Sequence, residues 1–172
     1  DWEKNPMFMM KVAKEFLNKH KDWKWVFTSS AKELRSNDQF IVDAIKELDE
    51  TEGRFIVKTD MTKHGYYDLL NRASIQFNSA LQDYVSFTLL EASTYMCDVV
   101  YPRFKSFPEC VPSNRLYDPF DVGSALEVLE DSIREPHSHY NIAKLSSLGC
   151  VMDAYIIKNG KYLNLPIFLF II

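Results

Sequence analysis

This 172-residue sequence lacks the signals that are typical of membrane, secreted and disulfide-rich proteins. No apolar stretch is long enough to span a bilayer, because a membrane-spanning helix needs about 20 apolar residues. The charged opening residues, Asp1-Trp2-Glu3-Lys4, are not typical of a signal peptide. Three cysteines in a chain of this length do not indicate a disulfide framework. We therefore expect a reducing, cytoplasmic setting.

The motifs of several common enzyme classes are also missing. The chain has no G-x-G-x-x-G and no Walker A sequence, so dinucleotide and P-loop sites lack support. It has no G-x-S-x-G, the turn that exposes a nucleophilic serine in many hydrolases. A net charge of −4, without a basic stripe, argues against nucleic acid as a partner. His137 and His139 have no matching Cys or Asp cluster nearby, so we expect no metal site.

What the sequence contains is an alternation of strand-like and helix-like segments. Apolar runs typical of strands cover residues 23–28, 54–59, 74–79 and 98–102. Helical spacing of apolar residues is found over about 6–17, 38–48, 66–73, 89–96 and 122–133, and a further helix is expected over 139–149. Asn5 is the expected N-cap of the first helix, and the stretch 104–119 is expected to be a loop. This alternation predicts a Rossmann-like, three-layer α/β/α fold with a mostly parallel sheet.

The chain is long enough for one domain with a real hydrophobic core. We expect that domain over residues 1–150 and a C-terminal extension over 151–172. The extension ends in an apolar run, 165–172, which is either a buried strand or the cut edge of a longer protein.

The segment Asp83–Glu91 is the most informative one for function. It follows the third expected strand, and two carboxylates bracket a loop and the first turns of a helix. Ligands of open α/β sheets bind at the carboxyl ends of strands, and a helix N-terminus attracts phosphate through its free N–H groups. The backbone N–H groups of Phe87 and Thr88, beside Ser86, are therefore candidate phosphate donors. Glu91 can accept hydrogen bonds from a sugar diol, so the layout suits a nucleotide sugar.

These residues resemble the C-terminal, donor-binding half of a retaining GT-B glycosyltransferase of the group 1 type. That family shows an acidic residue, seven others and then Glu, and Asp83 and Glu91 stand at this spacing, with Asp83 in place of the usual Glu. Glu3-Lys4-Asn5-Pro6 resembles the step that follows the family's first strand, and Leu116-Tyr117-Asp118-Pro119 resembles the segment before its final helix. The resemblance covers roughly residues 1–134. The first strand and the N-terminal, acceptor-binding half are missing.

The resemblance implies a role for each candidate residue. Asp83 and Lys4 are the implied catalytic residues, Asp83 at the transferred sugar and Lys4 at the diphosphate. Glu91 is implied to accept hydrogen bonds from the ribose, and Thr59 lies in the loop that holds the nucleobase by position. No cofactor and no metal are implied, since the nucleotide sugar is the donor substrate. The implied protein partner is the acceptor-binding half, without which we expect little or no turnover.

Two alternatives remain open at this stage. The family's loop glycines are replaced by Tyr84 and Ser86, which leaves the backbone less free to approach a ligand. The first alternative is therefore that the chain is a catalytically silent α/β binding module derived from such an enzyme. The second alternative is a nucleotide-sugar epimerase of the GT-B fold, which epimerises the sugar without an acceptor.

Overall fold

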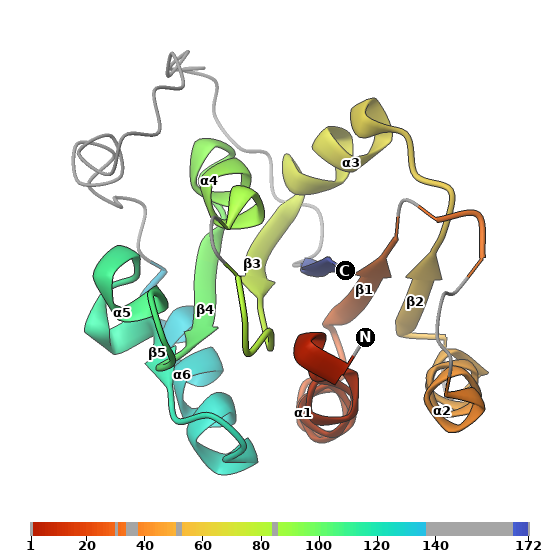
Figure 1. Cartoon of the computed structure of the whole chain (residues 1–172), viewed down its shortest axis with the longest axis horizontal. Coiled ribbons are helices and arrows are strands. Elements are labelled where there is room, and N and C mark those ends of the chain that lie inside the picture. The colour runs from red at the N-terminus through yellow and green to blue at the C-terminus, as the bar shows by residue number, and fades with distance from the viewer. Residues whose placement is uncertain are drawn as a thin grey trace.

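The computed structural model describes residues 2–29, 31–33, 38–50, 53–83, 86–136 and 167–171. They form a six-stranded sheet with helices on both faces (Figure 1). In chain order the elements are η1 (Trp2–Lys4), α1 (Pro6–Lys19), β1 (Lys24–Thr28), α2 (Gln39–Glu50), β2 (Phe55–Lys58), α3 (Lys63–Leu70), β3 (Ala73–Phe77), α4 (Phe87–Thr94), β4 (Asp98–Pro102), α5 (Phe107–Cys110), η2 (Ser113–Arg115), β5 (Leu116–Tyr117), α6 (Val122–Arg134) and β6 (Ile167–Ile171).

The sheet confirms the predicted parallel α/β class. Its strand order is β2-β1-β6-β3-β4-β5, and every pairing between neighbours is parallel. If β6 is counted as the first strand, this is the 3-2-1-4-5-6 order of doubly wound nucleotide-binding folds. The position of β6 is also the switch point, because the chain runs outward in one direction from β1 and in the other from β3.

The C-terminal strand β6 occupies the centre of the sheet. Leu169 is in register with Val26 of β1 on one side and with Gln76 of β3 on the other. Central strands of parallel sheets read as continuous apolar runs, and Ile167–Ile171 has this composition. In this sheet order β6 occupies the position of the first strand. The division of the chain at residue 150 stays a prediction.

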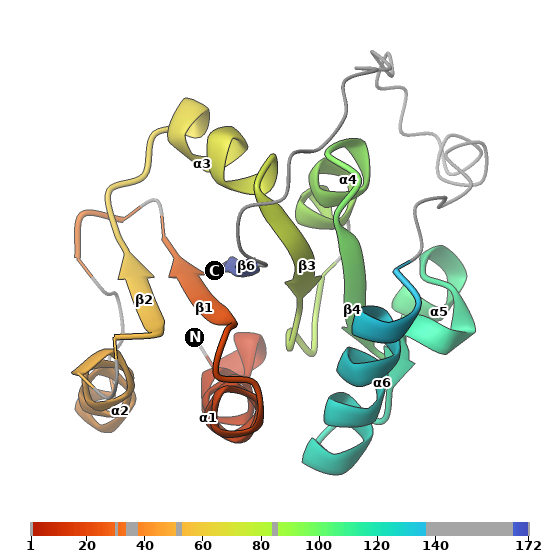
Figure 2. The same cartoon turned by 180° about the vertical axis from the view of Figure 1, so that it is seen from behind.

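Two hydrophobic clusters hold the helices to the two faces of the sheet. Trp25 and Phe27 of β1 pack on the face covered by α1, α2 and α6, whereas Val26 between them packs on the face covered by α3, α4 and α5. This alternation follows from the period of two along a strand. The two layers lie on opposite sides of the sheet in Figures 1 and 2.

Several expected element boundaries differ in the structure. Asn5 precedes α1 but has a left-handed backbone, with φ of 49°, and makes no side-chain cap. Ala73 belongs to β3, not to the third helix. Met96 lies beyond the end of α4 with φ of 59° and is exposed, so it is not part of the packed stripe. The stretch 104–119 is not only a loop, because it contains α5, η2 and β5. The helix expected over 139–149 lies outside the described residues.

Cys97 is buried, as expected from its place beside an apolar strand. Its sulfur lies 3.2 Å from the carbonyl oxygen of Leu70. Among the described residues, no helix combines the length and the apolar character needed to cross a membrane.

Candidate functional site

The structure brings the Lys4 segment to the loop that follows β3. The Ser79 hydroxyl donates hydrogen bonds to the carbonyl oxygens of Lys4 at 2.8 Å and of Asn5 at 3.3 Å. The backbone N–H of Leu81 donates to the carbonyl oxygen of Glu3 at 2.7 Å. The backbone of Lys4 therefore lies beside residues 79–81, just after the carboxyl end of β3 and before the Asp83–Glu91 segment.

The N-terminus of α4 lies next along the same loop. Ser86 is its N-cap residue, but the side chain makes no capping hydrogen bond. Instead, the Ser86 hydroxyl lies 3.2 Å from that of Thr88 and 3.3 Å from that of Tyr101. In the part of the chain that the structure describes, the backbone N–H groups of Phe87 and Thr88 have no protein acceptor. These two groups are available to an anion, as helix geometry predicts for the first turn.

Buried polar side chains lie beneath this helix end, and the sequence analysis missed them. Tyr101 of β4 is fully buried, and burial raises the pKa of its hydroxyl. Gln76 of β3 is also buried, and its side-chain oxygen has no hydrogen-bond partner among the described residues. On the opposite face of the sheet, Tyr117 donates to the carbonyl oxygen of Asn78 at 2.7 Å. A glutamine inside an apolar strand was the one sequence signal for this cluster.

Glu91 is held by side chains of the neighbouring helix α3. The Tyr67 hydroxyl donates to Oε1 of Glu91 at 3.1 Å, and the Lys63 ammonium lies 4.0 Å from the same oxygen. The Tyr66 hydroxyl is buried without a hydrogen-bond partner among the described residues. Burial, followed by the charge of Glu91, raises the pKa of Tyr66 well above its usual value. Neither Lys63 nor Tyr67 belongs to a recognised motif, so sequence reasoning did not identify them as neighbours of Glu91.

Asp83 and Thr59 stand on separate loops at the carboxyl ends of strands. Asp83 is half-buried, and its backbone carbonyl accepts a hydrogen bond from the Ser106 hydroxyl at 3.5 Å. Thr59 comes directly after β2 and is half-buried. The next residue, Asp60, donates its backbone N–H to Ala31, which ties this loop to the segment after β1. The structure thus joins Lys4 to the loop before α4 and keeps Thr59 on a different loop.

A groove of about 220 Å³ lies elsewhere, between α1 and α2. Its lining combines apolar side chains such as Met10 and Leu48 with the basic Lys11 and Lys14. None of the residues predicted for donor binding lines it. No group of three or more potential metal ligands occurs in the described ranges, and His137 and His139 lie outside them.

A scan against protein-family models and a search of curated proteins found no match. A search of solved structures found a likeness to the UDP-forming α,α-trehalose-phosphate synthase from Burkholderia xenovorans, with a TM-score of 0.62 and 13% sequence identity. The likeness covers 87% of this chain and 38% of that protein, so the chain spans less than half of its length. The chain therefore shares the fold of part of that protein.

Proposed function

We propose that this chain is the donor-binding domain of a retaining GT-B glycosyltransferase that transfers a hexose from a nucleoside-diphosphate sugar to a hydroxyl acceptor. The domain comprises residues 1–150 together with β6 from the extension. Its partner is an acceptor-binding domain across the cleft, and its setting is the cytoplasm, as expected for a chain whose few cysteines do not form a disulfide framework.

One observation carries this proposal: the free end of α4 lies at the switch point of the sheet. Two N–H groups, those of Phe87 and Thr88, have no acceptor among the described residues and begin a helix next to the loop that is tied to η1. In doubly wound sheets the ligand crevice lies outside the carboxyl ends of the strands at this point. A diphosphate placed there meets the helix N-terminus and the side chain of Lys4.

The chemistry follows from where charge develops. When the glycosidic bond of the donor breaks, negative charge grows on the departing diphosphate. The fixed N–H groups of α4 and the cation of Lys4 stabilise that charge more in the transition state than in the ground state. Asp83 contacts hydroxyl groups of the transferred sugar, Glu91 contacts the ribose, and the loop at Thr59 holds the nucleobase. No cofactor takes part.

We expect Glu91→Ala to weaken nucleotide binding roughly 10- to 100-fold, because hydrogen bonds to a charged group contribute about 1.5–3 kcal/mol. Calorimetric titration of the chain with UDP-, GDP- and ADP-sugars measures this and identifies the base. Glu127→Ala is the matched control, since Glu127 is an exposed glutamate of a helix on the other face of the sheet. Equal affinities of the Glu91 and Glu127 variants would contradict the role given to Glu91.

The silent binding module is the second candidate, favoured by the replacement of the loop glycines by Tyr84 and Ser86. It predicts that the donor is bound but not turned over even when the acceptor-binding half is present. An assay of the complete protein for sugar transfer and for hydrolysis of the donor separates the two candidates. An epimerase would instead yield an epimerised sugar without any acceptor.

A further inference from the structure

The carboxylate of Glu91 is restrained by helix α3. Both contacts from α3, the Tyr67 hydroxyl at 3.1 Å and the Lys63 ammonium at 4.0 Å, are made to Oε1. The Glu91 side chain is 18% exposed. The carboxylate is therefore held by helix α3 while the side chain stays partly exposed.

Tyr67 is itself held firmly by its neighbours. Its ring stacks on that of Tyr95 with 5.5 Å between centroids, and the ring of Tyr66 lies 5.6 Å away. The Lys63 ammonium lies over the Tyr67 ring, 5.6 Å from its centroid. A hydroxyl on a ring fixed in this way loses little conformational freedom when it binds, which is the basis of pre-organisation.

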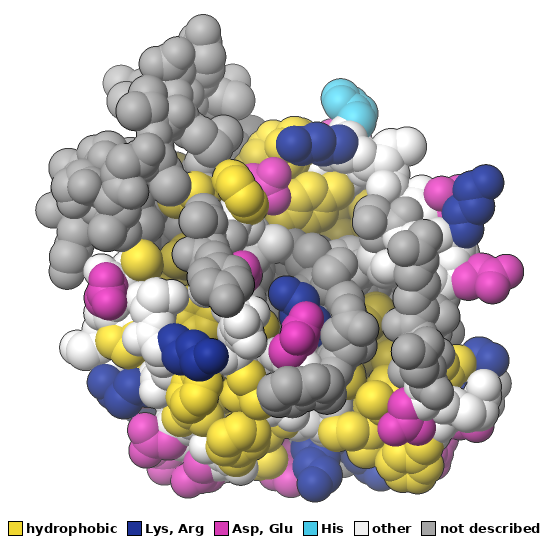
Figure 3. Space-filling model, viewed as in Figure 1, with side chains coloured by type: hydrophobic (Ala, Val, Ile, Leu, Met, Phe, Trp, Pro, Cys, Tyr) yellow, Lys and Arg dark blue, Asp and Glu magenta, His cyan; other side chains and the backbone are white. Residues whose placement is uncertain are grey.

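The surroundings also balance the charge of Glu91. Tyr67, and then Glu91, raise the pKa of Lys63, so that this side chain remains a cation beside the carboxylate. In the region of α3 and α4, Figure 3 shows a basic and an acidic side chain close to each other beside a hydrophobic surface. The Lys63 cation therefore reduces the repulsion between the Glu91 carboxylate and an anionic nucleotide.

We infer that Tyr67 is a positioning residue that, through Oε1 of Glu91, sets how strongly the site prefers a nucleotide with a ribose diol. This inference rests on the proposed function. With Oε1 held by α3, the carboxylate cannot turn freely and accepts hydrogen bonds from the two hydroxyl groups of the ribose in a fixed orientation. Helix α3 then controls donor selectivity without touching the donor.

The test compares a ribonucleoside diphosphate with its 2′,3′-dideoxy analogue, using the base selected by the nucleotide-sugar panel. We expect Tyr67→Phe to weaken binding of the ribonucleotide roughly 3- to 10-fold, as the loss of one hydrogen bond predicts. Binding of the dideoxy analogue should change less than about 2-fold, because it has no hydroxyl groups for Glu91 to accept. Adding Tyr67→Phe to Glu91→Ala should cause no further loss, since the two act through one interaction.

Tyr95→Phe is the matched control, because it keeps the stacked ring and removes a neighbouring hydroxyl. Its ribose preference should equal that of the unaltered chain. A merely structural role of Tyr67 predicts equal losses for both nucleotides, and this result, or an unchanged ribose preference, overturns the inference while leaving the proposed function intact. If the unaltered chain binds none of the nucleotides, the proposed function fails and the inference falls with it.

Discussion

Leu169→Pro is expected to unfold the chain or to lower its free energy of unfolding by more than about 3 kcal/mol, the cost of a proline inside a regular element. Leu169 lies in the middle of β6, in register with Val26 and with Gln76. A strand with neighbours on both edges uses all its N–H groups in the ladder, and proline has none to donate. Without β6, the β1–β2 half of the sheet loses its pairing to the β3–β4–β5 half. Urea unfolding followed by circular dichroism measures the loss.

Leu169→Ile is the control for this experiment, because it keeps the N–H group and a β-branched residue suits a strand. Its unfolding midpoint should stay close to that of the unaltered chain. Since β6 also stands at the switch point, any folded Leu169→Pro protein should bind nucleotide poorly. A proline variant with an unchanged midpoint and unchanged binding would show that β6 does not complete the sheet.

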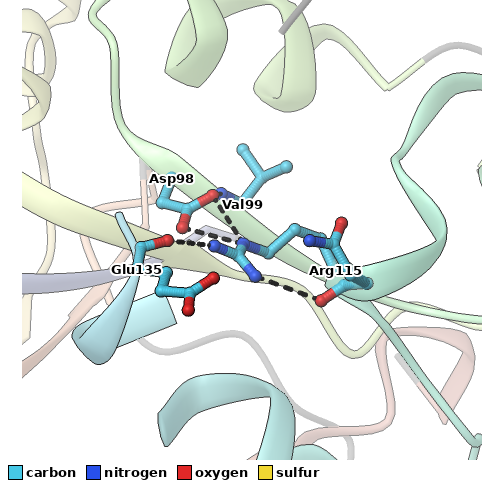
Figure 4. Close-up of polar contacts among 5 residues, drawn as sticks. Asp98, Val99, Arg115 and Glu135 are labelled. Atoms are coloured by element: carbon cyan, nitrogen blue, oxygen red, sulfur yellow. Dashed lines mark hydrogen bonds and ion pairs between the residues drawn. The ribbon is translucent and has the colours of Figure 1, made fainter. Parts of the chain in front are cut away.

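Arg115→Met is expected to lower the free energy of unfolding by about 3–5 kcal/mol, because it leaves the buried carboxylate of Asp98 without its partner. The two side chains are 1% and 2% exposed. Nε of Arg115 donates to both oxygens of Asp98, at 3.1 and 2.9 Å (Figure 4). The guanidinium also donates to the carbonyl oxygens of Asn114 and Glu135. It therefore joins the start of β4, the turn η2 and the end of α6.

The matched control is Arg134→Met. The Arg134 side chain is 72% exposed and pairs with Asp131 on the same helix. Exposed pairs contribute little, so we expect a change within about 0.5 kcal/mol. A double variant that replaces both Asp98 and Arg115 by leucine or methionine should recover much of the loss, because no charge remains buried. Equal effects of the Arg115 and Arg134 variants would contradict this account. Asp98 lies at the amino end of β4, so nucleotide affinity should not change while the protein is folded.

Some helix and strand boundaries predicted from the spacing of apolar residues were wrong, because tertiary contacts determined the local structure there. Ala73 continues the apolar spacing of the third helix, yet it pairs with Ile167 of β6 and so belongs to a strand. Met96 has helical spacing, but its left-handed backbone ends the packed stripe of α4. The stretch 104–119 looked irregular because of its prolines, although β5 within it pairs with β4 at the edge of the sheet.

The sequence by itself determined the α/β class, the order of the main strands and helices, and the place of Asp83 and Glu91 around the start of α4. These features depend on the periodicity of residues within a few positions of one another, which a single segment contains. The tertiary structure alone decided that β6 enters the centre of the sheet, that Tyr67 binds Glu91 and that Arg115 pairs with Asp98. Such contacts join segments distant along the chain, and their partners are chosen by the packing of whole layers, which no local pattern records.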